Sequence, residues 1–243
     1  MIAGIVGLKR AVRCAVDSTM HFRTWRRSDL LTVIAALSCG DYYVVCSDSK
    51  ATDLILSFLT VKLEYITDPP VCWATSGDSA IGQEFDLCVR NIDWGMATWD
   101  EVKNITESEI ARLNGKWRRL QRAAGKKPDP YDVANALIVG FVQGEGRILK
   151  LTDRGPGEFI TGSFAAVGSG EPHAFISYQV LRKLVTPPMP HERKTIEAII
   201  ELTAQTNSQQ CGGPIQTLRV SRGGLDVADI QALERLRETF GQA

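Results

Sequence analysis

A threonine, an aspartate and a lysine near the start of the chain have the types and spacing that could activate a hydroxyl nucleophile. Thr32 begins an apolar, β-branched run, Asp48 follows a second such run, and Lys62 lies within a third. A threonine hydroxyl reacts poorly at neutral pH, so it needs an adjacent base and a cation that stabilises the alkoxide. An α-amine, with an ordinary pKa of about 7.7–8.0, could supply that base if Thr32 were the first residue of its chain.

The elements predicted around these residues would bring them together. Residues 32–37 and 42–46 are apolar, and a turn sequence, Cys39-Gly40-Asp41, separates them, so the sequence predicts a β-hairpin. Residues 61–66 form a third apolar segment that presents Lys62. Residues 71–76 are predicted to form a fourth strand.

The rest of the chain predicts helix pairs between further hairpins. A helix is predicted to open at Gly77-Asp78-Ser79 with Ile81, Phe85 and Cys88 on one face, and a second at Thr98, where Thr98 and Glu101 match a capping box. Apolar runs predict strands over 136–142, 148–152, 158–160, 164–167 and 215–220, and helical spacing predicts helices over 175–184, 196–203 and 230–240. This order favours stacked α and β layers, an α+β fold, over alternating βαβ units.

Composition limits the class of protein. Apolar residues make up 44% of the 243 residues, charged residues 23%, and the formal net charge is zero, so a globular chain with a substantial core is expected and nucleic-acid binding is not favoured. No apolar run approaches the length of a membrane span. The six cysteines form no C-x-x-C pair, which predicts reduced thiols and a cytoplasmic location.

No cofactor or metal is implied by the sequence. His21, His173 and His191 form no metal-binding or catalytic pattern, and we expect His173 and His191 to face solvent. The chain contains no glycine-rich phosphate-binding motif of the P-loop or dinucleotide type.

Residues 1–31 differ from the rest of the chain and are expected to lie outside the fold, which we place at residues 32–243. They carry six basic residues against two acidic ones and show no clear strand pattern. Three interpretations remain open: a propeptide, a basic targeting or interaction arm, or an upstream extension from a mis-assigned start.

An ordered series of short motifs resembles the proteasome β-subunit family of N-terminal nucleophile hydrolases, which includes the HslV peptidases and Anbu-type relatives. The series comprises Thr32-Val33-Ile34-Ala35, Ser47-Asp48-Ser49-Lys50-Ala51-Thr52, Lys62-Leu63, Ser76-Gly77, Gly168-Ser169-Gly170-Glu171-Pro172 and Gly212-Gly213-Pro214-Ile215. The resemblance implies a four-layer αββα sandwich, assembly into a homo-oligomeric ring, and a peptide or protein substrate. Whether an ATPase partner exists is left open.

The resemblance also implies a role for individual residues. Thr32 matches the nucleophile, Lys62 the lysine that lowers its pKa, and Asp48 the acid that orients that lysine. Gly77 matches the oxyanion donor and Ser169 the serine near the α-amine. The supporting positions are Lys50, Ser208 and Asn207, and the small residues of the substrate pocket are Ala51, Thr75 and Ser79.

The chain departs from the family pattern at several points. Leu31, rather than glycine, precedes Thr32, the loop between Asp48 and Lys62 is slightly short, and Ser208 and Cys211 replace the family's aspartate and serine. An ungapped alignment of the first strand would place Leu30 at the nucleophile position, but it requires an insertion before Asp48.

Two functional hypotheses therefore remain at this point. The first is a threonine-type peptidase or amidohydrolase that acts when Thr32 is the mature N-terminus. The second is a catalytically silent ring or scaffold subunit that retains residues 1–31. Taken singly, Thr32 could be a strand residue, and Asp48 and Lys62 a surface ion pair.

Overall fold

The fold was analysed in a computed structural model, which describes residues 32–53, 56–127, 133–153, 155–184, 192–206 and 211–241. The predicted extension at 1–31, together with Asn207, Ser208, His21 and His191, lies outside the described residues. Of residues 51–53 and 56–58 only the backbone is described.

The first sheet contains the predicted N-terminal hairpin. Strand β1 (Ile34–Ser38) pairs with β2 (Tyr42–Ser47), and Ile34 lies opposite Ser47. The sheet is antiparallel throughout, in the order β10-β1-β2-β11-β12, with β10 at Phe164–Val167, β11 at Gln216–Ser221 and β12 at Gly224–Leu225. This register places the start of β1 next to the end of β2, and therefore places Thr32 near Asp48.

The second sheet is also antiparallel, in the order β5-β6-β7-β8-β9. Its strands are β5 (Glu64–Ile66), β6 (Val71–Ser76), β7 (Asn135–Val142), β8 (Glu145–Leu151) and β9 (Glu158–Phe159). A separate hairpin, which the sequence pattern did not predict, joins β3 (Lys50–Asp53) to β4 (Leu56–Leu59).

Five helices lie within the described residues: α2 (Ser79–Arg90), α3 (Trp99–Ala123), α4 (Glu171–Leu184), α5 (Glu192–Thr206) and α6 (Val227–Phe240). Asp78 caps α2, and the predicted capping box at Thr98 and Glu101 is confirmed. The buried face of α2 ends with Val89 rather than with the expected Cys88, which is only half-buried. No described helix has the length and apolar character needed to cross a membrane.

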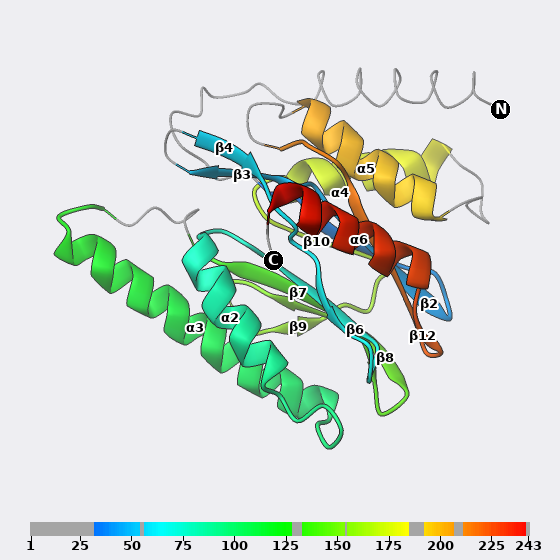
Figure 1. Cartoon of the computed structure of the whole chain (residues 1–243), viewed down its shortest axis with the longest axis horizontal. Helices are drawn as coiled ribbons and strands as arrows, with labels where there is room; N and C mark the ends of the chain where they lie inside the picture. Colours follow the sequence, from blue (N-terminus) through cyan, green and yellow to red (C-terminus); the bar gives the residue numbers. More distant parts are fainter. Residues whose placement is uncertain are drawn as a thin grey trace.

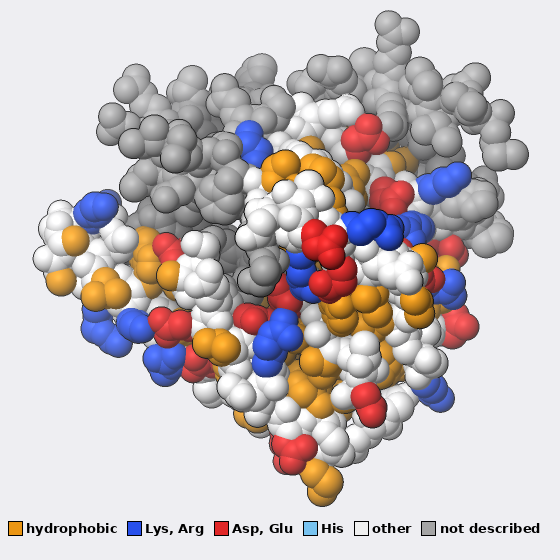
Figure 2. All heavy atoms as spheres, viewed as in Figure 1, with side chains coloured by type: hydrophobic (Ala, Val, Ile, Leu, Met, Phe, Trp, Pro, Cys, Tyr) orange, Lys and Arg blue, Asp and Glu red, His pale blue; other side chains and the backbone are white. Residues whose placement is uncertain are grey.

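Three apolar clusters hold these elements together. One lies between the first sheet and helices α4 and α5, a second between the second sheet and helices α2 and α3, and a third joins the two sheets with α6. Figure 1 shows α4 and α5 on one side of the sheets and α2 and α3 on the other. On the face drawn in Figure 2, acidic and basic side chains are interspersed with apolar ones.

Strand β1 contributes to two of these clusters because successive side chains of a strand point to opposite faces. Ala35 and Leu37 belong to the cluster under α4 and α5, whereas Ile34 and Ala36 belong to the cluster between the sheets. The strand that begins just after Thr32 is therefore buried on both faces.

Two local predictions were wrong. Lys62 lies in an irregular segment, because strand β5 begins only at Glu64. His173 is buried, with 9% of its surface exposed, rather than facing solvent. His173 lies in the first turn of α4, and the residue before this helix packs closely against the chain before β1, since a Cβ on Gly170 would come within 2.8 Å of the Val33 side chain.

Two leucines on α3 test the position of the second cluster. Leu113 is 1% exposed and Leu120 is 59% exposed. We expect Leu113→Ala to lower the free energy of unfolding by about 2–5 kcal/mol, because it leaves a cavity in a packed core. The matched Leu120→Ala should change it by less than about 0.5 kcal/mol. Urea unfolding of both variants measures the difference, and equal losses would contradict the assignment of the buried face.

Candidate active site

The side chains of Thr32, Asp48 and Lys62 meet at one end of the first sheet, where β1 begins and β2 ends. Lys62 Nζ donates to Thr32 Oγ1 at 3.0 Å and to Asp48 Oδ1 at 2.8 Å. A third hydrogen bond from Nζ reaches the backbone carbonyl of Lys50 at 2.6 Å. The lysine and aspartate side chains are 6% and 1% exposed, so this is a buried ion pair and not the surface pair considered from the sequence.

Both oxygens of the Asp48 carboxylate are held by backbone groups. The backbone N–H of Val33 donates to Oδ1 at 3.1 Å, and that of Gly212 donates to Oδ2 at 3.1 Å. Asp48 also pairs with the strand start directly, because its own N–H donates to the Val33 carbonyl. The carboxylate therefore joins β1, the glycine pair before β11 and Lys62.

Burial and charge act in opposite directions on Lys62. Removal from water lowers the pKa of Lys62 below its ordinary value, and the neighbouring Asp48 carboxylate raises it. Burial raises the pKa of the nearby Cys211 thiol to about 12, with a further contribution from Asp48. The Cys211 thiol is therefore neutral at neutral pH.

The acceptors around Nζ fit two protonation states of Lys62. Asp48 Oδ1 and the Lys50 carbonyl can only accept, whereas the Thr32 hydroxyl can donate or accept. An ammonium can donate to all three oxygens. A neutral amine can donate to the first two and accept the Thr32 proton on its lone pair. The three hydrogen bonds around Nζ can therefore form with Lys62 in either protonation state.

The segment Gly168-Ser169-Gly170 lies against the backbone of Thr32. A Cβ on Gly168, which has a φ of +97°, would come within 2.0 Å of the Thr32 carbonyl oxygen. The Gly170 N–H donates to the same oxygen at 3.3 Å. The buried Ser169 hydroxyl between them has no hydrogen-bond partner among the residues that the structure describes.

Gly77 occupies a position that only glycine fits. Its φ is +110°, and a Cβ there would lie 2.6 Å from the Val133 carbonyl oxygen. Gly77 lines the same cavity as Thr32 and Lys62, which has a volume of about 580 Å³. Two of the predicted pocket residues, Thr75 and Ser79, also line this cavity.

The acidic residues in this cavity are already paired. Arg90 donates to Glu64 at 2.5 Å and to Asp86 at 2.9 Å, and the Asp78 side chain caps α2. Burial raises the pKa of Glu64, while Arg237 and Arg90 lower it. The cavity wall is therefore polar without a surplus of unpaired acids.

The remaining predicted residues are placed less fully. Lys50 begins β3 and contributes its carbonyl to Lys62, while the Ala51 side chain is not described. Asn207 and Ser208 lie outside the described residues, so their roles stay predictions. Sequence reasoning missed Gln216, whose amide contacts the Lys62 backbone. Its only signal in the sequence was a polar residue at the start of an apolar strand.

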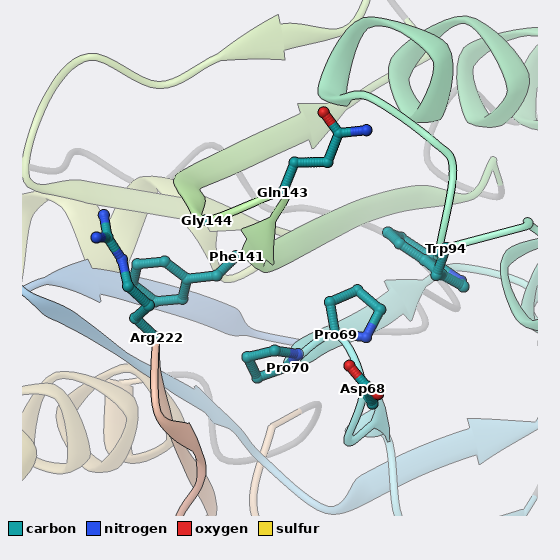
Figure 3. A pocket seen from close by; sticks show the side chains of 9 residues that line it. Asp68, Pro69, Pro70, Trp94, Phe141, Gln143, Gly144 and Arg222 are labelled. Carbon is teal, nitrogen blue, oxygen red and sulfur yellow. The ribbon is translucent and has the colours of Figure 1, made fainter.

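Two other cavities differ in their relation to Thr32. One of about 440 Å³ adjoins the site, because it shares Gly77 and includes Ser76 and Ser169. The other, of about 330 Å³, shares no lining residue with the Thr32 cavity and is bounded by Pro69, Trp94 and Phe141 (Figure 3). Among the described residues, no group of three or more His, Cys, Asp and Glu side chains could hold a metal ion.

Comparisons with known proteins identify the fold. No family model matches the chain, and no curated protein matches it. Among solved structures, the Anbu (ancestral beta-subunit) from Yersinia bercovieri is similar, with a TM-score of 0.61 and 14% sequence identity over 86% of this chain and 93% of that chain. The predicted resemblance to the proteasome β-subunit and Anbu-like family is thus confirmed at the level of the fold.

The buried ion pair makes a prediction about stability. We expect Asp48→Asn to lower the free energy of unfolding at pH 7 by about 3–5 kcal/mol, because the Lys62 ammonium loses its counter-ion. The loss should shrink as the pH rises through the pKa of Lys62, which lies below 10.5, since a neutral amine needs no counter-ion. Urea unfolding at pH 7 and pH 10 measures both values. Asp41→Asn, at an exposed turn, is the matched control, and a loss independent of pH would contradict the prediction.

Proposed function

We propose that this protein is a threonine-type peptidase or amidohydrolase, with Thr32 as an N-terminal nucleophile once residues 1–31 are absent. The observation that carries the proposal is the position of Lys62 Nζ, which bonds the Thr32 hydroxyl and the Asp48 carboxylate at once. A buried cation in contact with a hydroxyl lowers the cost of forming the alkoxide.

In the proposed reaction, Thr32 Oγ1 attacks the carbonyl carbon of a peptide or amide bond. The hydroxyl proton passes to the freed α-amine of Thr32, and the Lys62 ammonium stabilises the alkoxide as it forms. Collapse of the tetrahedral intermediate breaks the C–N bond, and the amine returns its proton to the leaving nitrogen. Water, deprotonated by the same amine, then attacks the acyl carbon of the ester formed with Thr32. The bond between that carbon and Thr32 Oγ1 breaks, the acid is released, and the amine returns its proton to Oγ1.

Gly77 and Ser169 are proposed to complete the site. The Gly77 N–H would donate to the oxyanion, a contribution of about 2.7–4 kcal/mol in comparable sites. Ser169 has a buried hydroxyl without a partner in the described ranges, and the segment that carries it touches Thr32. A freed α-amine would give this hydroxyl a partner.

The proposal includes the wider organisation of the protein. The three apolar clusters support a four-layer αββα sandwich formed by residues 32–243. From the resemblance to the proteasome β-subunit family we also propose that the protein forms a homo-oligomeric ring and acts on peptides or proteins. Ala51, Thr75 and Ser79 are proposed to line the substrate pocket. Lys50, Asn207 and Ser208 are proposed to support the catalytic residues.

The nucleophile is tested by controlling the first residue of the chain. Material whose N-terminus is Thr32 should cleave fluorogenic peptides and should form a covalent adduct at Thr32 with a peptide epoxyketone or β-lactone. Thr32→Ala in the same material should abolish both, whereas Thr32→Ser should keep a measurable rate because it retains a hydroxyl and an α-amine. Intact mass and peptide mapping identify the adduct.

The control is the chain that retains Leu31, in which the Thr32 nitrogen is an amide and cannot act as a base. We expect this chain to be inactive under the same conditions. Full activity in the Leu31-containing chain or in Thr32→Ala would contradict the proposed nucleophile. Inactivity of all the variants, with an intact fold, would favour the silent ring or scaffold subunit.

The pH dependence of kcat/KM should be bell-shaped. Activity should rise as the α-amine loses its proton, near an ordinary pKa of about 7.7–8.0. It should fall as Lys62 loses its proton, at a pH below 10.5, because burial lowers the pKa of Lys62. Asp48→Asn should move this alkaline fall to lower pH, since the Asp48 carboxylate raises the pKa of Lys62. An alkaline fall that stays at the same pH in Asp48→Asn would exclude Lys62 as its cause.

A further inference from the structure

Lys62 is carried by a segment, residues 60–63, that belongs to no strand or helix. Backbone groups of a buried segment outside a sheet must be satisfied by other partners. Here the N–H groups of Lys62 and Leu63 both donate to Oε1 of Gln216, at 2.8 and 3.2 Å. One side-chain oxygen thus accepts hydrogen bonds from the backbone N–H of the proposed catalytic lysine and from that of the next residue.

The other end of the Gln216 amide holds the segment from its preceding side. Its Nε2 donates to the Thr60 carbonyl at 2.7 Å and to Ser49 Oγ at 2.8 Å. A glutamine amide offers two acceptor positions and two donors, so all four are used. With 1% of its surface exposed, Gln216 is a fully satisfied buried amide.

The strand that carries Gln216 connects it to the acid of the site. Gln216 is the first residue of β11, and it lies opposite Ser47, which immediately precedes Asp48. Because antiparallel pairing fixes the register of neighbouring strands, the backbone of Gln216 lies at a defined position relative to the residue before Asp48. Asp48 directly follows β2, and the Lys62 backbone is bonded by the first residue of β11. The pairing of β2 with β11 therefore positions both partners of the ion pair.

A second side chain holds the other side of the same backbone. Arg237, from α6, donates to the Leu63 carbonyl at 3.1 Å and to the Glu64 carboxylate at 2.8 Å. Arg237 secures the carbonyl one residue beyond Lys62, whereas Gln216 bonds the N–H of Lys62 itself. Of these two side chains, Gln216 therefore makes the more direct contact with the Lys62 backbone.

We propose that Gln216 is a positioning residue for Lys62, and that its side-chain amide takes the place of a strand partner that fixes where the lysine stem begins. The lysine stem is long and flexible, so the location of Nζ depends on that starting point. This inference rests on the proposed function for its effect on catalysis. The hold of Gln216 on the 60–63 segment is a property of the fold alone.

The test compares two substitutions at one position. Gln216→Leu keeps similar volume and removes all four hydrogen bonds. Gln216→Glu keeps an oxygen that can accept from Lys62 and Leu63 but loses the donors to the Thr60 carbonyl and Ser49 Oγ. In material that begins at Thr32, we expect Gln216→Leu to lower kcat by about 10²-fold with little change in KM, the size of effect that a 1 Å misplacement produces. Gln216→Glu should recover part of that loss. Gln205→Glu, on the exposed surface of α5, is the matched control, and its kcat and KM should equal those of the unsubstituted chain.

Amide hydrogen exchange in the full chain provides a readout that needs no activity. The Lys62 and Leu63 amides should exchange faster in Gln216→Leu and remain protected in Gln216→Glu, while amides in the centre of β7 stay protected in both variants. Loss of protection throughout Gln216→Leu would mark general unfolding, and the Gln216→Glu protein would then decide. Lys62 and Leu63 amides that are unprotected in Gln216→Glu, while its β7 amides stay protected, would overturn the inference.

The two proposals fail in different ways. If the unsubstituted chain that begins at Thr32 is active and Gln216→Leu has the same kcat, the role of Gln216 is overturned and the proposed function stands. If the unsubstituted chain that begins at Thr32 shows neither activity nor adduct formation, the proposed function is overturned. Hydrogen exchange of the Lys62 and Leu63 amides would still decide whether Gln216 positions residues 60–63.

Discussion

The buried ion pair between Lys62 and Asp48 is the interaction on which the rest of the site depends. Each charge loses several kcal/mol of hydration on burial, and the pair is tolerated only where its remaining hydrogen-bonding positions are filled. Asp48 receives two backbone N–H groups besides the ammonium, and Lys62 donates to Thr32 and to the Lys50 carbonyl. These partners come from the start of β1, the start of β3 and the glycine pair before β11. Filling the hydrogen-bonding positions of this one ion pair therefore requires several separate segments of the chain to lie next to each other.

The apolar clusters fix the position of β1 beside the ion pair. Both faces of β1 are buried, under α4 and α5 on one side and between the sheets on the other. A one-residue slip would exchange its two faces and place the wrong side chains in each cluster. The register of β1, and with it the position of Thr32, is thus fixed by packing. Gly168 adds a steric condition, because no side chain fits against the Thr32 carbonyl.

The sequence predicted the parts of this arrangement that depend on local patterns. The hairpin of β1 and β2 follows from two continuous apolar runs on either side of a turn, and the start of α3 follows from its capping box. The irregular segment at Lys62, the burial of His173 and the role of Gln216 could not be predicted in this way. Each depends on contacts between residues distant in the chain, such as the contact from Gln216 to Lys62, and no local propensity encodes them. The β3–β4 hairpin was missed because its short strands show no clear alternation.

The hydrogen-bonding groups around Lys62 all have partners, whereas one buried group near Thr32 has none among the described residues. Around Lys62, the Asp48 carboxylate and the Gln216 amide have all their partners with Thr32 in its present position. In the segment that contacts the Thr32 carbonyl, the buried Ser169 hydroxyl has no partner among the described residues. A buried hydroxyl without a partner costs about 1–3 kcal/mol. Under the proposed function, a freed Thr32 amine would remove that cost and supply the base in the same step. The fold would then prepare the cation in advance, and removal of the preceding residues would complete the site.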